Sequence, residues 1–197
     1  MRKMNEQTDE QLVNSYLNGN NNAFDILLKR YERKVFTYIA YSVKNEEVAQ
    51  DLFQDCFMRI ITKLHSGMYT ENGKFASWVM RIAHNLIIDF HRQNQGNNVI
   101  SNDESEHDLL NNSAIALDYN REKEFVDKQL LKDVKALIKK LPDNQREVVL
   151  LRFYQELSFK EIADITGVSI NTALGRMRYA LINLRRLADK FDVSLAG

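Results

Sequence analysis

Apolar side chains recur every three or four residues along most of the chain, which is the spacing of one buried face on an α-helix. Thr8 and Gln11 form a capping-box pattern that opens a short helix ending near Gly19, and Asn22 is suited to cap the next helix. A polar stretch interrupts the apolar spacing over 93–120. The further helices predicted on either side of it are 23–43, 46–64, 75–92, 121–141 and, starting at Pro142, 142–154.

The stretch 157–187 is typical of a helix-turn-helix. Ser158 and Glu161 form a second capping box, Gly167 is suited to end that first helix in the left-handed conformation, and Ser169 can cap the second helix. One buried face is expected on the second helix, made by Ala173, Met177, Ala180, Leu181, Leu184 and Leu187.

The other face of that second helix carries hydrogen-bonding and cationic groups. Asn171, Gly175, Arg178 and Tyr179 point away from the apolar face, and Thr172 and Arg176 lie on its flank. A helix with such a face is what reading the DNA major groove requires. On this stretch alone, a surface helix with solvated arginines remains the alternative.

Only one proline and seven glycines occur in 197 residues, which together with the long periodic segments predicts an all-α fold. We expect two small helical domains, 8–94 and 123–190, joined by a flexible acidic linker, 95–122. The formal net charge is zero, which does not favour a DNA-binding protein, but the charge is unevenly distributed. The segment 171–190 contains five basic residues and one acidic residue, whereas 101–120 contains five acidic residues and no Lys or Arg.

Several classes of function are not indicated. No apolar run of about 18 residues occurs and the first ten residues lack a signal core, so we expect no membrane insertion. The single Cys56 cannot form an intramolecular disulfide, which favours a reducing cytoplasm. Neither metal-ligand spacing nor a nucleophile with its base is present, so we expect no metal, no cofactor and no enzymatic activity.

Two ordered motifs resemble the bacterial sigma factors of the extracytoplasmic-function group. Residues 51–57 (DLFQDCF) and 75–85 (FASWVMRIAHN), leading to Asp89, are similar to sigma region two. Leu141-Pro142, 145–152 (QREVVLLR), Leu157-Ser158, 161–163 (EIA) and Thr172 with Arg176 are similar to region four. The resemblance covers roughly 10–94 and 123–188. It implies a factor that binds core RNA polymerase, directs it to promoter DNA and helps to open the duplex.

The resemblance assigns a partner to an acidic helix face. It makes Asp51, Gln54, Asp55 and Met58 the surface that docks on the polymerase clamp helices. Carboxylates suit arginines on a partner, and methionine adds an adaptable apolar contact. Without the resemblance, these residues would be interpreted as a solvated helix face.

The loop 65–74 and the helix after it correspond to the part of the family that captures a base flipped from the minus-ten element. Tyr69 and Trp78 are available as stacking surfaces, although Trp78 is equally suited to anchor the core. Arg81, Asn85 and Arg92 are expected to contact DNA backbone or base edges.

For the minus-thirty-five element, the resemblance implies that the second helix of the helix-turn-helix enters the major groove. The expected contacts are Arg146 on the preceding helix, with Asn171, Thr172, Gly175, Arg176, Arg178 and Tyr179. We expect Arg178 to read guanine and Arg176 to bind phosphate. The chain departs from the family pattern at Leu174, Gly175 and Tyr179, so the preferred DNA sequence stays open.

Two other functions fit the same residues. A free-standing helix-turn-helix regulator would bind promoter DNA without polymerase, and a helical adaptor would bind a protein partner yet support no transcription. The sigma interpretation instead names core RNA polymerase, promoter DNA and an anti-sigma factor as the expected partners.

Overall fold

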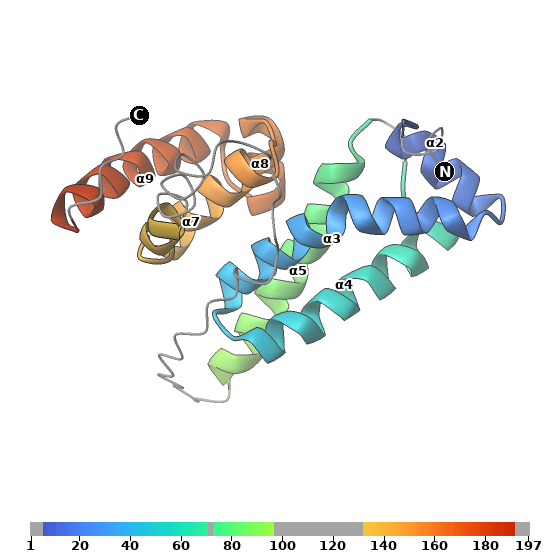
Figure 1. The fold of residues 1–197 in the computed structure, drawn as a ribbon, viewed down its shortest axis with the longest axis horizontal. Coiled ribbons are helices and arrows are strands. Elements are labelled where there is room, and N and C mark those ends of the chain that lie inside the picture. The colour runs from blue at the N-terminus through green and yellow to red at the C-terminus, as the bar shows by residue number, and fades with distance from the viewer. Residues whose placement is uncertain (1–5, 71–72, 97–131, 192–197) are drawn as a thin grey trace, which may run out of the picture. The chain divides into compact units, whose positions relative to one another are not determined.

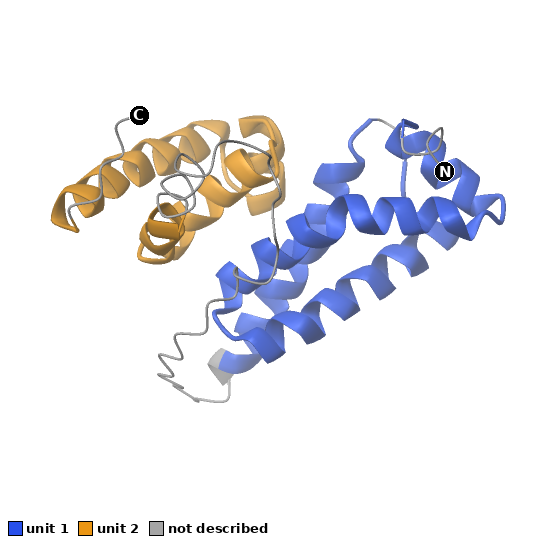
Figure 2. Ribbon diagram, viewed as in Figure 1, with its two compact units in different colours: residues 1–102 blue, residues 103–197 orange. Residues whose placement is uncertain are grey.

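The computed structural model describes residues 6–70, 73–96 and 132–191. The chain divides into two compact units, 1–102 and 103–197, shown in different colours in Figure 2. Within the described ranges every regular element is a helix (Figure 1), which confirms the predicted all-α fold. The predicted linker 95–122 and the helix expected from 121 lie largely outside the described residues.

The described residues of the first unit form three long helices and one short one. These are α2 (Asp9–Leu17), α3 (Asn21–Val43), α4 (Glu46–His65) and α5 (Phe75–Gly96). Helices α3, α4 and α5 pack against one another in pairs, and α2 lies against α3 (Figure 1). Their shared core includes Leu27, Val35, Tyr38, Ile39, Ile60, Leu64, Val79, Met80 and Ala83.

Local capping sets the ends of these helices. The Thr8 capping box is confirmed, because Gln11 N–H donates to Thr8 Oγ1 at 3.3 Å and Thr8 N–H donates to Gln11 Oε1 at 3.0 Å. The prediction that Asn22 caps α3 is wrong. Asn20 has the extended backbone of an N-cap, and Asn22 already lies inside the helix. Lys44 ends α3 in the left-handed region, with φ 57°.

The second unit contains a helical segment at 132–139, then α7 (Asp143–Val149), η1 (Leu150–Tyr154), α8 (Phe159–Thr166) and α9 (Ile170–Lys190). Both α7 and α8 pack on α9. The helix-turn-helix follows its predicted signals. Ser158 forms a capping box with Glu161, Gly167 has φ 66°, and Ser169 Oγ accepts from Thr172 N–H at 3.1 Å.

Three details of this unit differ from the prediction. The helix predicted over 142–154 ends in a π-helix, in which Gln155 N–H donates to the Leu150 carbonyl five residues back. Pro142 is the N-cap of α7 and not its first helical residue. Leu181 is 41% exposed, so it does not belong to the buried face predicted for α9.

Candidate functional site

The acidic face of α4 is a continuous exposed stripe. Asp51, Gln54, Asp55 and Met58 are all exposed, and their spacing of three and four places them on successive turns. The Met58 side chain is 63% exposed. This stripe leaves two carboxylates and a thioether open to a partner, as a docking surface would require.

The opposite side of α4 faces the core and carries Cys56. Its thiol is buried, and burial raises the pKa of Cys56 to about 12, an effect that the positive charge of Arg59 partly offsets. A thiol that stays protonated is neither a reactive nucleophile nor a ready metal ligand. In the described part of the chain, no three His, Cys, Asp or Glu side chains are grouped to hold a metal ion.

A shallow apolar hollow borders the acidic stripe, and the sequence interpretation missed one of its walls. Asp55, Met58 and Met68 line a space of about 550 Å³ together with Arg59, Thr62, Lys63 and Ser66. Met68 is 64% exposed, and its sulfur lies 3.9 Å from Lys63 Nζ. Two exposed methionines beside carboxylates suit a partner that offers both basic and apolar side chains.

A second groove brings together four of the five residues predicted to contact the minus-ten element. Trp78, Arg81, Asn85 and Arg92 from α5 line a space of about 400 Å³. The same groove is lined by Arg59, Lys63, Ile82, Ile88 and Asp89. Its walls therefore carry four cationic side chains and one carboxylate, which favours a nucleic-acid backbone.

Arg59 and Lys63 come from α4 and were not predicted as site residues. Their spacing of four residues places them on one helix face, but only the packing of α4 on α5 shows that this face borders the groove. The Asp89 carboxylate lies 3.9 Å from both Arg59 and Arg92. These ion pairs are solvent-exposed and weak, so they leave the arginines available to a stronger anion.

Tyr69 does not line this groove, although its ring lies against the wall. The centroids of the Tyr69 and Trp78 rings are 4.9 Å apart, and Phe75 packs edge-on against Tyr69 at 5.3 Å. Trp78 is half-buried, so it both anchors this aromatic cluster and faces the groove. Stacking of a DNA base on either ring stays a prediction.

The predicted DNA-reading face of α9 is accessible. Asn171, Thr172, Arg178 and Tyr179 are exposed, whereas Gly175 and Arg176 are half-buried. The Thr172 hydroxyl already shares a hydrogen bond with the Ser169 hydroxyl, since the two oxygens are 2.8 Å apart. A Cβ added at Gly175 would meet no atom within 4 Å, so the surface of the helix is open at that position.

The prediction that Arg146 contacts DNA needs correction. Arg146 is only 3% exposed. Its guanidinium donates hydrogen bonds to the carbonyls of Ile138, Lys139 and Leu141, at 3.4, 3.2 and 2.6 Å respectively. It also pairs with Asp143 at 2.8 Å. Arg146 thus closes the end of the preceding helical segment from inside the unit, and we remove it from the interface.

Comparisons with known proteins show which family the chain belongs to. The chain matches the family models for Sigma-70 region 2 over residues 27–96 and Sigma-70, region 4 over residues 131–179. It is 30% identical over 165 residues to the RNA polymerase sigma factor SigZ of Bacillus subtilis, covering 83% of this chain and 85% of that relative. It is 28% identical over 170 residues to the ECF RNA polymerase sigma factor SigW of the same organism, with coverage of 85% and 90%.

A solved structure shows the same fold. The sigma factor RpoE from Bartonella quintana, crystallised with the anti-sigma factor NepR, superposes with a TM-score of 0.64 at 20% sequence identity, over 84% of this chain and 96% of that one. None of the helices described in our structure is long and apolar enough to cross a membrane.

Proposed function

Because the chain belongs to the sigma-70 family of RNA polymerase sigma factors, and within it to the extracytoplasmic-function group, we propose that it binds core RNA polymerase, directs it to promoters and promotes DNA opening. The observation that carries the proposal is the cationic groove between α4 and α5. Helix α4 supplies one wall of this groove and also bears the acidic stripe. One small unit thereby offers a surface for the polymerase and a surface for DNA.

We assign the stripe of Asp51, Gln54, Asp55 and Met58 to the polymerase and extend it by Met68. The acids supply charge-assisted hydrogen bonds to arginines, and the two exposed methionines supply adaptable apolar contact beside them. The groove is assigned to the single-stranded minus-ten element. Arg59, Lys63 and Arg81 bind phosphates there, and Trp78 offers a ring to a base.

The C-terminal unit is assigned to the minus-thirty-five element. The N-terminal turns of α9 enter the major groove, where Asn171 and Thr172 lie near phosphate and Arg178 reads guanine through O6 and N7. The domains 8–94 and 123–190, with the linker 95–122, then bind one promoter through two sites.

An anti-sigma factor is the proposed regulator. The solved relative from Bartonella quintana is named as a complex with an anti-sigma factor, and the exposed Met58 and Met68 are suited to bind such a protein when polymerase is absent. We also propose that the factor acts in the cytoplasm, and that it works as an initiation factor and not as an enzyme.

Run-off transcription with purified core polymerase and a promoter library tests the function. We expect the chain to give start-site selection that core enzyme lacks, and the selected templates define the recognised sequence. Specific DNA binding by the chain without polymerase would favour a free-standing regulator. Failure to select any start site, with polymerase binding intact, would favour an adaptor.

Arg178→Ala is expected to lower transcription from the selected promoters about tenfold and to relax the preference at one base pair of the minus-thirty-five element. A bidentate arginine–guanine contact is the physical reason. Run-off yields on templates varied across that element measure the effect. Arg186→Ala removes an exposed arginine from the same helix as the control. Equal losses for both variants, with unchanged base preference, would contradict the assignment.

The combined change Arg59→Ala and Arg81→Ala is expected to weaken holoenzyme binding to single-stranded non-template DNA about tenfold. It should also reduce the slope of log K against log salt by about 1.4, since two phosphate contacts are lost. Asp89→Asn should strengthen the same binding, because it removes the carboxylate in the groove. Fluorescence anisotropy across a salt series measures both effects. An unchanged slope would show that the two arginines do not contact phosphate.

A further inference from the structure

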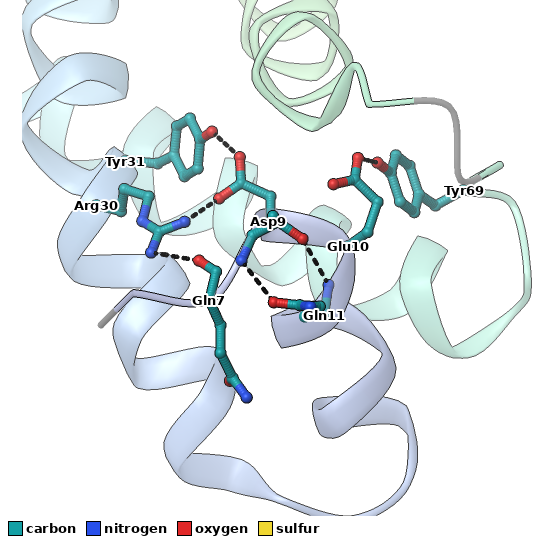
Figure 3. A network of polar contacts seen from close by, with 8 residues as sticks. Gln7, Asp9, Glu10, Gln11, Arg30, Tyr31 and Tyr69 are labelled. Atoms are coloured by element: carbon teal, nitrogen blue, oxygen red, sulfur yellow. Dashed lines mark hydrogen bonds and ion pairs between the residues drawn. The ribbon is translucent and has the colours of Figure 1, made fainter. Parts of the chain in front are cut away.

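The short helix α2 contacts the end of α4 and the segment directly after it, at His65 and Tyr69. The Tyr69 hydroxyl donates to Glu10 Oε1 at 3.4 Å (Figure 3). At the start of the loop, the Tyr16 hydroxyl lies 3.0 Å from His65 Nε2, and the two rings pack edge-on at 5.1 Å. Tyr16 of α2 therefore contacts His65, the last residue of α4, and Glu10 of α2 contacts Tyr69 in the segment that follows.

The first turn of α2 is itself fixed to α3. The Asp9 carboxylate accepts hydrogen bonds from the Arg30 guanidinium and the Tyr31 hydroxyl, and Arg30 Nη2 also donates to the Gln7 carbonyl at 3.1 Å (Figure 3). Burial, and then the hydrogen bond to Asp9, raises the pKa of Tyr31 far above its usual value. The Tyr31 hydroxyl therefore stays a donor, and the turn of α2 that carries Glu10 is tied to α3 through Asp9.

A row of aromatic rings connects this base to the groove. Phe75 packs edge-on against Tyr31 at 5.4 Å and against Tyr69 at 5.3 Å. Tyr69 in turn packs on Trp78, with the ring centroids 4.9 Å apart, and Trp78 lines the groove. The Trp78 ring is therefore bounded by Tyr69 from the loop and by Phe75 from its own helix, at 5.7 Å, and Tyr69 is the neighbour that Glu10 holds.

We propose that Glu10 is a positioning residue for recognition of the minus-ten element, acting through Tyr69 to fix the aromatic wall on which a base is selected. The inference rests on the proposed function of the groove. Glu10 does not line that groove, so it acts on bound DNA only through Tyr69, and the effect expected of it is on the choice between bases. A correctly held aromatic wall fits one base better than another, whereas phosphate contacts attract any sequence.

The test uses holoenzyme made with Glu10→Ala, Tyr69→Phe or both changes. The probes are fluorescent single-stranded oligonucleotides carrying a minus-ten element from a selected promoter, with each of the four bases at its most discriminating position. Each single variant is expected to reduce the ratio of affinities for the preferred and next-best base about fivefold. The double variant should show the same fivefold loss and no more, because the Tyr69–Glu10 hydrogen bond is absent from all three variants.

Glu32→Ala on α3 is the matched control, because it removes an exposed carboxylate and should leave the ratio unchanged. Glu10→Gln keeps an acceptor oxygen and should retain the ratio within about twofold. The inference is overturned if the variants lower only thermal stability or overall affinity, or if the two single losses multiply in the double variant. Absence of start-site selection by the unaltered chain would overturn the proposed function, and this inference with it.

Discussion

Arg146→Ala is expected to lower the free energy of unfolding of the C-terminal unit by about 3 kcal/mol. The change removes a buried guanidinium that donates to three backbone carbonyls at the end of the 132–139 helical segment. Those carbonyls then lose charge-assisted partners in a part of the unit where water replaces them poorly. Urea unfolding followed by far-ultraviolet circular dichroism measures the loss.

The chain provides an internal control for that experiment. Trp78 is the single tryptophan and lies in the N-terminal unit. The urea midpoint of its fluorescence transition should therefore be unchanged. Part of the circular dichroism transition should move to a lower urea concentration. Arg186→Ala removes an exposed arginine of α9 and should move neither transition. A dichroism curve that is the same for Arg146→Ala and the unaltered chain would disprove the role of Arg146 in closing the helical segment.

The double charge reversal Asp51→Arg with Asp55→Arg is expected to weaken binding to core RNA polymerase about 100-fold. Both carboxylates are exposed on one face of α4, so the change places two cations opposite a surface that we propose to be basic. Titration of a fluorescently labelled factor with core enzyme measures the affinity. Because neither side chain is buried, the Trp78 unfolding transition should be preserved.

A matched reversal on another helix separates position from net charge. Asp25→Arg with Glu32→Arg changes the charge of the chain by the same amount from exposed positions on α3. We expect this control to bind core polymerase within about threefold of the unaltered chain. If both double variants lost affinity equally, overall charge would be responsible and the α4 stripe would not be the docking surface.

The helix ends show which features of the fold are determined by residues close together in the sequence. The capping boxes at Thr8 and Ser158 and the left-handed Gly167 depend on neighbours within four residues, so their patterns predict the geometry directly. Asn22 failed because several asparagines adjoin the start of α3, and composition alone does not decide which has the extended backbone. The π-helix at η1 has no comparable sequence signal.

The candidate site was predictable where it lies on one helix. The α4 stripe and the exposed face of α9 follow from helical spacing, and the structure places those residues on accessible surface. Arg59 and Lys63 were missed because their role depends on which helix packs beside α4. Arg146 was misassigned because its charge suggests solvent, whereas the acceptors that bury it are backbone carbonyls and have no sequence signature.

The open space around Gly175 has a consequence for how such a factor diversifies. A Cβ added there meets no atom within 4 Å, so alanine demands no repacking and would strengthen α9 by up to about 1 kcal/mol. Position 175 can thus accept other residues on the face of α9 that we propose to contact the minus-thirty-five element. Under that proposal, a single substitution at position 175 is a way to change DNA preference without repacking the C-terminal unit.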